Sequence, residues 1–335
     1  MNQQDGAVFR RSCEGKGKAM TALKNKRESF GRRLAVGFRK HWRLHVLALP
    51  VLIYLILFSY APMFGIVLAF EKYSVVKGFF GSEWVGLKNF EFLFANNDAW
   101  RITRNTVLYN IAFIVVTTTL SVLLALVLNE LYFRRLSKTI QTMLIMPYFL
   151  SMSVVAIIVY AFIGPNGVVN SIIKSMGQRP ITSNWYTYKP LWPFLLVFVH
   201  SWKGVGYTAI VYVASISGIS QEYYEAAVLD GATKLQQARY VTLPHLRHII
   251  VIMLILSMGG MFRGDMGLSY NVTQNSGALY EVTDVIDTYV YRALKTLGNT
   301  GMSTAAGLYQ SVVGFIMIII SNMIVKRVDE DSALF

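Results

Sequence analysis

Long uninterrupted runs of apolar residues dominate the chain. Three segments of at least 24 residues contain no Asp, Glu, Lys or Arg, at residues 44–70, 106–129 and 139–163. A fourth run covers residues 302–325. Because an α-helix needs about 20 apolar residues to cross a bilayer, these four segments predict four membrane-spanning helices.

Two further segments fit a membrane span less cleanly. Residues 191–217 are long enough but contain His200 and Lys203, and residues 243–262 carry a basic pair near their start. Ionisable groups inside a membrane tend to face the interior of a helix bundle, so both segments are also interpreted as spans. The sequence therefore predicts an all-α integral membrane protein with six transmembrane helices.

Composition and charge agree with a membrane protein and predict its orientation. The chain is 54% hydrophobic and only 15% charged, against about 25% charged residues in soluble proteins. With the N-terminus inside, 20 Lys and Arg residues fall on cytoplasmic segments and 11 fall on outer loops. Since Lys and Arg favour the cytoplasmic side, we expect both termini to be cytoplasmic.

The net charge of +14 comes mainly from residues 1–43, which hold 12 of the 32 Lys and Arg residues. We expect this segment to be a basic cytoplasmic tail attracted to anionic lipid headgroups, and not a nucleic-acid-binding region, because no folded domain accompanies the charge. The first apolar run is too long for the core of a cleavable signal peptide. The expected organisation is this tail, a six-helix domain at 44–328 and a short cytoplasmic tail at 329–335.

A polar segment, residues 218–244, separates the fourth and fifth expected spans. Ser220 can accept a hydrogen bond from the free amides at a helix start. Glu222 and Glu225 follow where the helix dipole favours acids, and Ala226 and Ala227 permit close approach of a partner. These residues predict a short amphipathic helix at the membrane surface.

The second half of this segment predicts a turn and another helix. Gly231 allows a backbone conformation that is costly for other residues. A second short helix, from residue 232 to about 242, is expected to end against Pro244, which is accepted in the first turn of the next span. The segment would thus be a helix, a tight turn and a helix that present carboxylates and small residues to a partner.

The same segment resembles a motif of a known family. It is similar to the Glu-Ala-Ala loop of the membrane subunits of bacterial ATP-binding-cassette (ABC) importers. The matching pattern is Glu225-Ala-Ala, three residues, Gly231, nine residues and Val241-x-Leu-Pro, in which Val241 replaces Ile. An Ala-rich interfacial loop helix is the alternative. The resemblance implies that this is the coupling helix, which docks in a cleft of the ATPase subunit through Glu222, Tyr224, Glu225, Ala226, Ala227, Asp230, Gly231, Leu243 and Pro244.

Two weaker patterns extend the resemblance to roughly residues 44–328. Residues 86–90, Gly-Leu-x-Asn-Phe, look like an element that follows the first span of sugar permeases. Residues 264–292 resemble a branch of type I, maltose-type carbohydrate permeases associated with oligosaccharides and polysaccharide fragments, and are expected to form an outer loop with a short amphipathic helix.

The resemblance also implies partners and a location. The fold would be that of a type I importer permease, a multi-pass protein of the bacterial cell membrane that forms half of a transmembrane pair. Its partners would be a second, different permease subunit, two ABC ATPase subunits, an extracellular solute-binding lipoprotein, membrane lipid and a carbohydrate substrate.

Substrate-path residues are expected among mixed aromatic and polar positions inside the spans, because sugars stack on aromatic rings and pair with polar groups. The candidates are Trp202, Lys203 and Tyr207 in the fourth span and, less specifically, Tyr309 and Gln310 in the sixth. Lys203 costs at least about 2.5 kcal/mol inside a bilayer, which favours a water-lined cavity or an acidic partner, although it could snorkel or pair with a neighbouring subunit. For His200, a hydrogen bond between helices is the expected role.

The sequence contains no phosphate-binding loop, no His-Glu-x-x-His and no cysteine cluster, since Cys13 is its only cysteine. We therefore expect no enzyme activity and no cofactor in this chain, with ATP and Mg bound by a separate ATPase. A secondary transporter or channel for a small polar solute is the alternative function, but it would leave the Glu-Ala-Ala loop without a role, and no inverted repeat is visible. A membrane-embedded enzyme is disfavoured because His200 has no carboxylate in the same span.

Overall fold

The computed structural model describes residues 42–95, 97–131, 133–180, 182, 184–296 and 298–328. The predicted tails at 1–43 and 329–335, together with Cys13, lie outside the described residues, apart from Trp42 and Arg43. The chain divides after Gly65 into two compact units, and each is described by itself.

The first unit holds most of the first predicted span. A continuous helical run covers Trp42–Phe70, 29 residues, which confirms the prediction at 44–70. It consists of α2 (Trp42–Leu55), a wide π-helical turn η1 (Ile56–Tyr60) and a narrow 3-10 segment η2 (Ala61–Phe70), whose end belongs to the second unit. Pro62, which lacks a backbone donor, follows the π-helical turn, a position where a regular helix would place its ring against a carbonyl oxygen.

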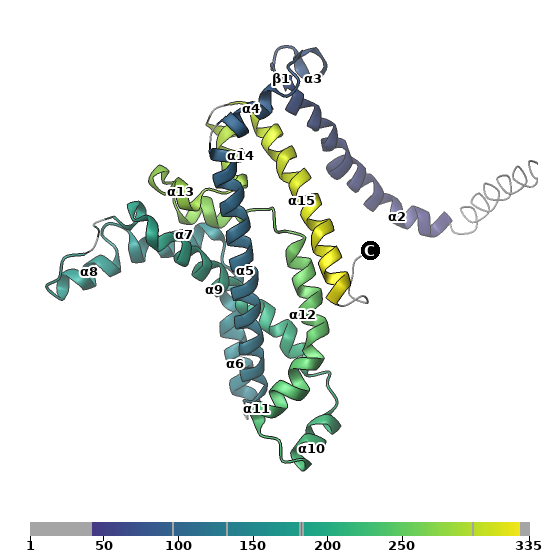
Figure 1. The fold of residues 1–335 in the computed structure, drawn as a ribbon, viewed down its shortest axis with the longest axis vertical. Helices are drawn as coiled ribbons and strands as arrows, with labels where there is room; N and C mark the ends of the chain where they lie inside the picture. Colours follow the sequence, from purple (N-terminus) through teal and green to yellow (C-terminus); the bar gives the residue numbers. More distant parts are fainter. Residues whose placement is uncertain are drawn as a thin grey trace, which may run out of the picture. The chain divides into compact units, whose positions relative to one another are not determined.

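The second unit is organised around two long helices that lie side by side, α5 (Asp98–Asn129) and α9 (Trp192–Ile216) (Figure 1). Both predicted spans are confirmed, and α5 begins eight residues before the expected 106–129. Their facing surfaces bury Tyr109 and Phe113 of α5 against Trp192, Leu196 and Val199 of α9. This apolar contact forms the centre of the unit.

A small structure follows the first span. Strands β1 (Glu71–Lys72) and β2 (Glu83–Trp84) pair antiparallel around α3 (Gly78–Gly81) and lead into α4 (Lys88–Ala95). Asn89, from the Gly-Leu-x-Asn-Phe element, donates through Nδ2 to the carbonyls of Ala69 (3.0 Å) and Glu71 (2.9 Å). The first bond satisfies a carbonyl that the end of a helix leaves without a partner, and the second ties the start of β1 to α4.

The third predicted span is wrong as a single helix. The apolar run at 139–163 contains the end of α6 (Arg134–Ile145), η3 (Met146–Phe149) and α7 (Met152–Ile163), followed by α8 (Val168–Ser175). Between η3 and α7 the backbone of Leu150 and Ser151 is extended. Pro147 removes a donor from the first turn, and the Ser151 hydroxyl caps α7 by accepting from the Val154 amide (3.3 Å), so a new helix starts inside the apolar run.

The backbones of α6 and α9 approach closely where the sequence has a glycine. A Cβ atom on Gly206 would overlap the carbonyl of Leu144. Because no other residue lacks a Cβ atom, this glycine brings the end of α6 against the middle of α9, next to the break after η3.

The polar segment after α9 forms α10 (Gln221–Leu229), α11 (Lys234–Gln237), a π-helical turn η6 (Ala238–Thr242) and α12 (Leu243–Met258). The prediction that the second short helix ends against Pro244 is wrong, since helical structure continues from Lys234 to Met258. In η6 the Leu243 amide reaches back to the Ala238 carbonyl. Such a wide turn makes room for the Pro244 ring without ending the helix.

The chain after α12 returns into the core of the unit. The predicted fifth span, 243–262, ends earlier, at Met258, and Gly259 and Gly260 follow in a turn. The next elements are η7 (Gly267–Val272), which packs against α7, then η8 (Gly277–Leu279), α13 (Tyr280–Thr283), α14 (Ile286–Lys295) and α15 (Thr300–Val328). The expected short amphipathic helix is α14, and α15 confirms the sixth span at 302–325.

Six helical segments of the described residues are long and apolar enough to cross a membrane: Trp42–Phe70, Asp98–Asn129, Met152–Ser175, Lys189–Ile216, Lys234–Met258 and Thr300–Ile320. The third joins α7 to α8, and the fourth joins η5 (Lys189–Leu191) to α9; the short η4 (Trp185–Thr187) precedes it. The predicted number of spans is confirmed, with the third displaced toward the C-terminus.

A buried ionic cluster fixes α13 and α14 against the start of α5. The Asp284 side chain is fully buried and accepts from Arg292 Nη2 (2.6 Å) and Thr288 Oγ1 (2.6 Å). Arg101 of α5 lies 3.5 Å from the same carboxylate. Asn105 of α5 donates to the Asp284 backbone carbonyl (3.0 Å), so this acid satisfies partners on two elements distant in sequence.

Candidate coupling surface and translocation cavity

The helix α10 begins where the sequence places a cap. The Ser220 hydroxyl accepts from the Glu222 amide (3.4 Å), as predicted. Gly231 has φ +79°, a conformation that glycine adopts without steric cost. Thr233 and Gln236 then cap the start of α11 reciprocally. Local sequence chemistry therefore builds the two helices and the turn between them.

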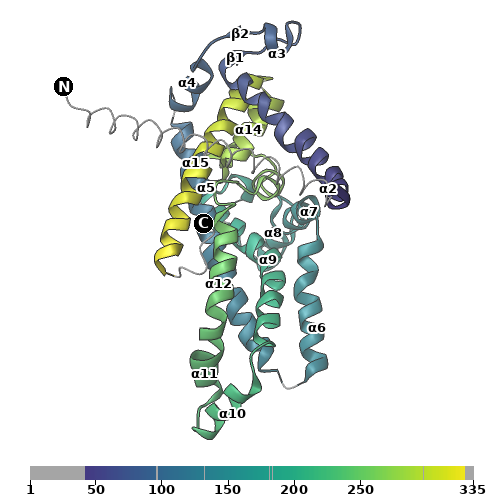
Figure 2. The ribbon, with the colours of Figure 1, turned by 90° about the vertical axis from the view of Figure 1, so that its right-hand side faces the viewer.

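The exposed side chains of α10 and α11, here called the coupling surface, lie at the end of the second unit away from α4 and α14 (Figures 1 and 2). Apolar and acidic groups are mixed on it: Leu229 is 88% exposed and Leu235 79% exposed, and the acidic residues Glu222 and Glu225 are exposed as well. Exposed large apolar groups next to charges are typical of a binding surface. The exposed members of the predicted coupling set are Glu222, Glu225, Ala226, Asp230, Gly231, Leu243 and Pro244.

The two remaining predicted residues, Tyr224 and Ala227, are half-buried. The Tyr224 hydroxyl lies 3.0 Å from Thr242 Oγ1, in η6, and so joins α10 to the helix that continues into α12. Lys234 at the start of α11 pairs with Glu130 at the end of α5 (3.3 Å). Two side-chain contacts thus connect the coupling surface to two of the long helices.

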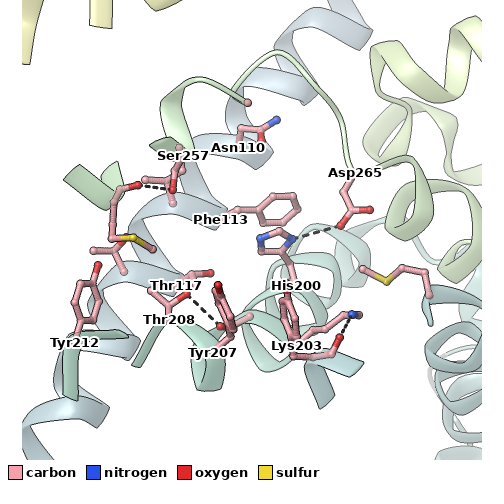
Figure 3. A pocket seen from close by; sticks show the side chains of 17 residues that line it. Asn110, Phe113, Thr117, His200, Lys203, Tyr207, Thr208, Tyr212, Ser257 and Asp265 are labelled. Carbon is pink, nitrogen blue, oxygen red and sulfur yellow. Dashed lines mark hydrogen bonds and ion pairs between the residues drawn. The ribbon is translucent and has the colours of Figure 1, made fainter. Parts of the chain in front are cut away.

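A cavity of about 430 Å³ lies among α5, η3, α9 and α12 (Figure 3). Of the predicted path residues, Lys203 and Tyr207 line it. Its other polar lining consists of Asn110, Thr117, Thr118, Tyr148, His200, Thr208, Tyr212, Ser257 and Asp265.

On one side of the cavity lies Lys203. Its Nζ donates to the Tyr148 backbone carbonyl (2.7 Å) and lies 5.4 Å from the centre of the Tyr148 ring. That ring stacks on Tyr207, with centroids 4.6 Å apart and planes at 12°. The η3 segment, just before the break, therefore supplies both a carbonyl for the ammonium and an aromatic neighbour for Tyr207.

His200 lies opposite an acid that sequence reasoning missed. Its ring stacks on Phe113 (centroids 3.9 Å apart), and its Nδ1 is 3.6 Å from Asp265 Oδ2. Asp265 Oδ1 accepts from the Leu268 amide (2.9 Å). Burial opposes ionisation, but the contact with His200, the Leu268 amide and the charge of Lys203 outweigh it and hold the pKa of the Asp265 carboxyl below its usual range.

The other three path candidates have different surroundings. Trp202 is 39% exposed and does not line the cavity. The Tyr309 hydroxyl lies 3.0 Å from Thr103 Oγ1, and Gln310 donates to the Phe262 carbonyl (2.6 Å) and to Asp287 Oδ2 (2.9 Å). The structure thus brings two of the five candidates together in one cavity.

Comparison with known proteins gives consistent matches. Residues 118–330 match the family model described as "Binding-protein-dependent transport system inner membrane component". Protein LplB of Bacillus subtilis (strain 168) is 35% identical, with 88% of this chain and 91% of that protein covered. The polygalacturonan/rhamnogalacturonan transport system permease protein YteP of the same strain is 32% identical over 96% of this chain and 99% of its own.

The fold is also found among solved structures. A chain of a bacterial ABC transporter involved in the import of the acidic polysaccharide alginate superposes with a TM-score of 0.78 at 30% identity, covering 89% of this chain and 99% of its own. The similarity therefore includes both units and is not confined to the polar loop.

Proposed function

This chain belongs to the family of binding-protein-dependent transport system inner membrane components, and from that premise we propose that it forms half of the translocation path for an oligosaccharide. It is a permease subunit of a type I ABC importer with a six-helix membrane fold. The names of YteP and of the alginate transporter support a carbohydrate substrate. The observation that carries the proposal is the coupling surface, an exposed polar pair of helices between two apolar spans.

The contacts of the coupling surface suggest how the transport cycle reaches the cavity. Movement of α10 would pass through Tyr224 and Thr242 to the continuous helix from α11 to α12. Met253 and Ser257 of α12 line the cavity. Closure of ATPase subunits on the coupling surface would therefore change the wall of the cavity that α12 provides, and the cavity would open alternately to the two sides.

The proposed assembly contains this chain, a second and different permease, two ATPase subunits that bind ATP and Mg, and a solute-binding lipoprotein. The predicted coupling residues are proposed to contact an ATPase. Lys203 and Tyr207 are proposed to contact substrate because they line the cavity, whereas Trp202, Tyr309 and Gln310 do not line it.

Purification tests this assembly. Expressed together with the proposed partner subunits, this chain should retain an ATPase in mild detergent. In proteoliposomes, the ATPase rate should rise when the sugar-loaded binding protein is added, since binding-protein docking and hydrolysis are coupled through the permease. Uptake that continues without ATP, or that follows an ion gradient, would instead indicate a secondary transporter.

Orientation is a separate expectation, resting on the 20 to 11 distribution of Lys and Arg. Ser220 is exposed beside α10, and Val76 is 96% exposed between β1 and α3; Ser183, another outer-loop position, lies outside the described residues. In a Cys13→Ser background, Val76→Cys should react with a membrane-impermeant thiol reagent in intact cells, and Ser220→Cys only in inverted vesicles. Reaction of both from the same side would refute the cytoplasmic placement of the coupling surface.

A further inference from the structure

We propose that the cavity is a receptor for a carboxylate, with Lys203 as the binding group, and that the transported sugar is therefore an acidic saccharide built from hexuronate units. This inference rests on the proposed function and adds the chemical class of the substrate. It starts from the charge on the cavity wall, where the ionisable groups other than tyrosines are His200, Lys203 and Asp265.

The Lys203 ammonium has donors to spare. An ammonium carries three donors, and one is used by the neutral carbonyl of Tyr148. Among the described residues, no carboxylate forms an ion pair with Lys203. Asp265, the acid on the same cavity wall, interacts with the charge of Lys203 only from beyond ion-pair distance. The ammonium therefore lacks a direct counter-ion, a costly arrangement in a membrane protein unless water or a ligand supplies the missing interactions.

Asp265, the acid that lines the same cavity, already interacts with other groups. Asp265 faces His200 through one oxygen and accepts the Leu268 amide through the other. The sticks in Figure 3 show Asp265 turned toward His200, whereas the Lys203 ammonium is directed at the carbonyl to which it donates. A ligand carboxylate could reach Lys203 without displacing the contact between His200 and Asp265.

The surroundings of Lys203 match the rest of a hexuronate unit. A sugar ring has an apolar face, for which the stacked pair Tyr148 and Tyr207 offers an aromatic neighbour within the same wall. Its hydroxyls need mixed donors and acceptors, which Thr117 and Thr208 supply on the cavity wall. The carboxylate, attached to that ring, would then receive the ammonium.

A neutral sugar would use Lys203 less well. A hydroxyl offers the ammonium only a dipole, whereas a carboxylate also brings an opposite charge, which strengthens the interaction in a site of low dielectric. The relatives agree with an acidic ligand, since the substrate named for YteP contains polygalacturonan and the matched transporter imports an acidic polysaccharide. The ammonium of Lys203 would therefore favour a ligand with a carboxylate, and the stacked Tyr148 and Tyr207 would favour a carboxylate attached to a sugar ring.

Protection of a cavity cysteine tests the inference without the binding protein, which could itself discriminate between acidic and neutral sugars. In the purified transporter complex, Ser257→Cys in a Cys13→Ser background is labelled with a small hydrophilic thiol reagent, and labelling of this chain is read by intact-mass spectrometry. The probes are tetragalacturonate and the same tetrasaccharide with its carboxyls reduced to alcohols.

We expect tetragalacturonate to protect the cysteine at a concentration at least about tenfold lower than the reduced probe. Adding Lys203→Met should remove this difference, and Lys203→Arg, which keeps the charge, should restore most of it. A merely structural role of Lys203 would weaken protection by both probes equally.

The possible failures are distinguishable. Equal protection by both probes, unchanged in Lys203→Met, would overturn the carboxylate receptor and leave the proposed carbohydrate path intact. Acid-selective protection that survives Lys203→Met would likewise overturn the role of Lys203. No protection by either probe would overturn both this inference and the assignment of the sugar path to this cavity.

Discussion

Replacing Glu225 with lysine is expected to reduce ATP-driven uptake by at least about tenfold while the six-helix fold remains inserted. Glu225 is exposed on α10 and has no structural partner that its replacement would disturb among the contacts of the described residues. Its proposed role is to meet a basic or amide-lined cleft of the ATPase. Reversal of a charge that becomes desolvated in an interface costs about 2–5 kcal/mol of binding free energy, which exceeds a factor of ten in affinity.

The measurements are co-purification of the ATPase and stimulation of its hydrolysis rate by the sugar-loaded binding protein. Glu225→Gln keeps the size of the side chain and should be affected less than Glu225→Lys. The control is Glu91→Lys, an equal charge reversal at an exposed site on α4, which should leave ATPase co-purification unchanged. Normal stimulation in Glu225→Lys would remove Glu225 from the coupling surface.

The membrane spans could be predicted where backbone hydrogen bonding in the bilayer permits only a helix. In a bilayer every backbone group needs a partner inside its own segment, so a long apolar run must be a helix. This holds for α5 and α15. It fails at 139–163, because mean hydropathy does not register a backbone break. An apolar run reads the same whether Leu150 and Ser151 are extended or helical.

The coupling surface could be predicted because its structure is local. Ser220, Gly231 and Thr233 act on residues within a few positions of themselves. The error lay at Pro244, where a π-helical turn, which depends on the packing of the continued helix, kept the chain helical.

The cavity could be predicted only in part because its contacts are distant in sequence. Lys203 and Tyr207 stood out as polar and aromatic groups in one span, but the Tyr148 carbonyl and Asp265 come from a backbone break and from a segment expected to be an outer loop. Gln310 shows the reverse case. In the sequence it looks like a path residue, because it is a polar residue next to an aromatic one inside a span. Only the tertiary structure reveals that its amide donates to Phe262 and Asp287.

Replacing Asp284 with alanine is expected to produce the largest loss of stability in the second unit. The carboxylate is fully buried and is shared by Arg292 at 2.6 Å and Arg101 at 3.5 Å. The side chains of Arg292 and Arg101 are themselves only 17% and 28% exposed. Arg101 would keep its ion pair with Asp98 at 2.8 Å, but Arg292 would lose its carboxylate. Removing one partner of a buried ion pair leaves an uncompensated charge and costs about 3–5 kcal/mol, so the free energy of unfolding should fall by that amount.

The test is unfolding of the purified complex in mixed detergent micelles, with Glu281→Ala as the matched control. Glu281 precedes Asp284 by three residues and also pairs with a cation, Lys189, at 2.5 Å, but its side chain is 65% exposed. Because water screens an exposed pair, Glu281→Ala should leave the unfolding midpoint close to that of the unmodified chain. Asp284→Asn, which keeps the shape but removes the charge, should destabilise nearly as much as Asp284→Ala, since the charge and not the volume satisfies the two arginines. Equal shifts for Asp284→Ala and Glu281→Ala would show that burial of the cluster does not determine its contribution, and that α14 is held against α5 by its apolar contacts alone.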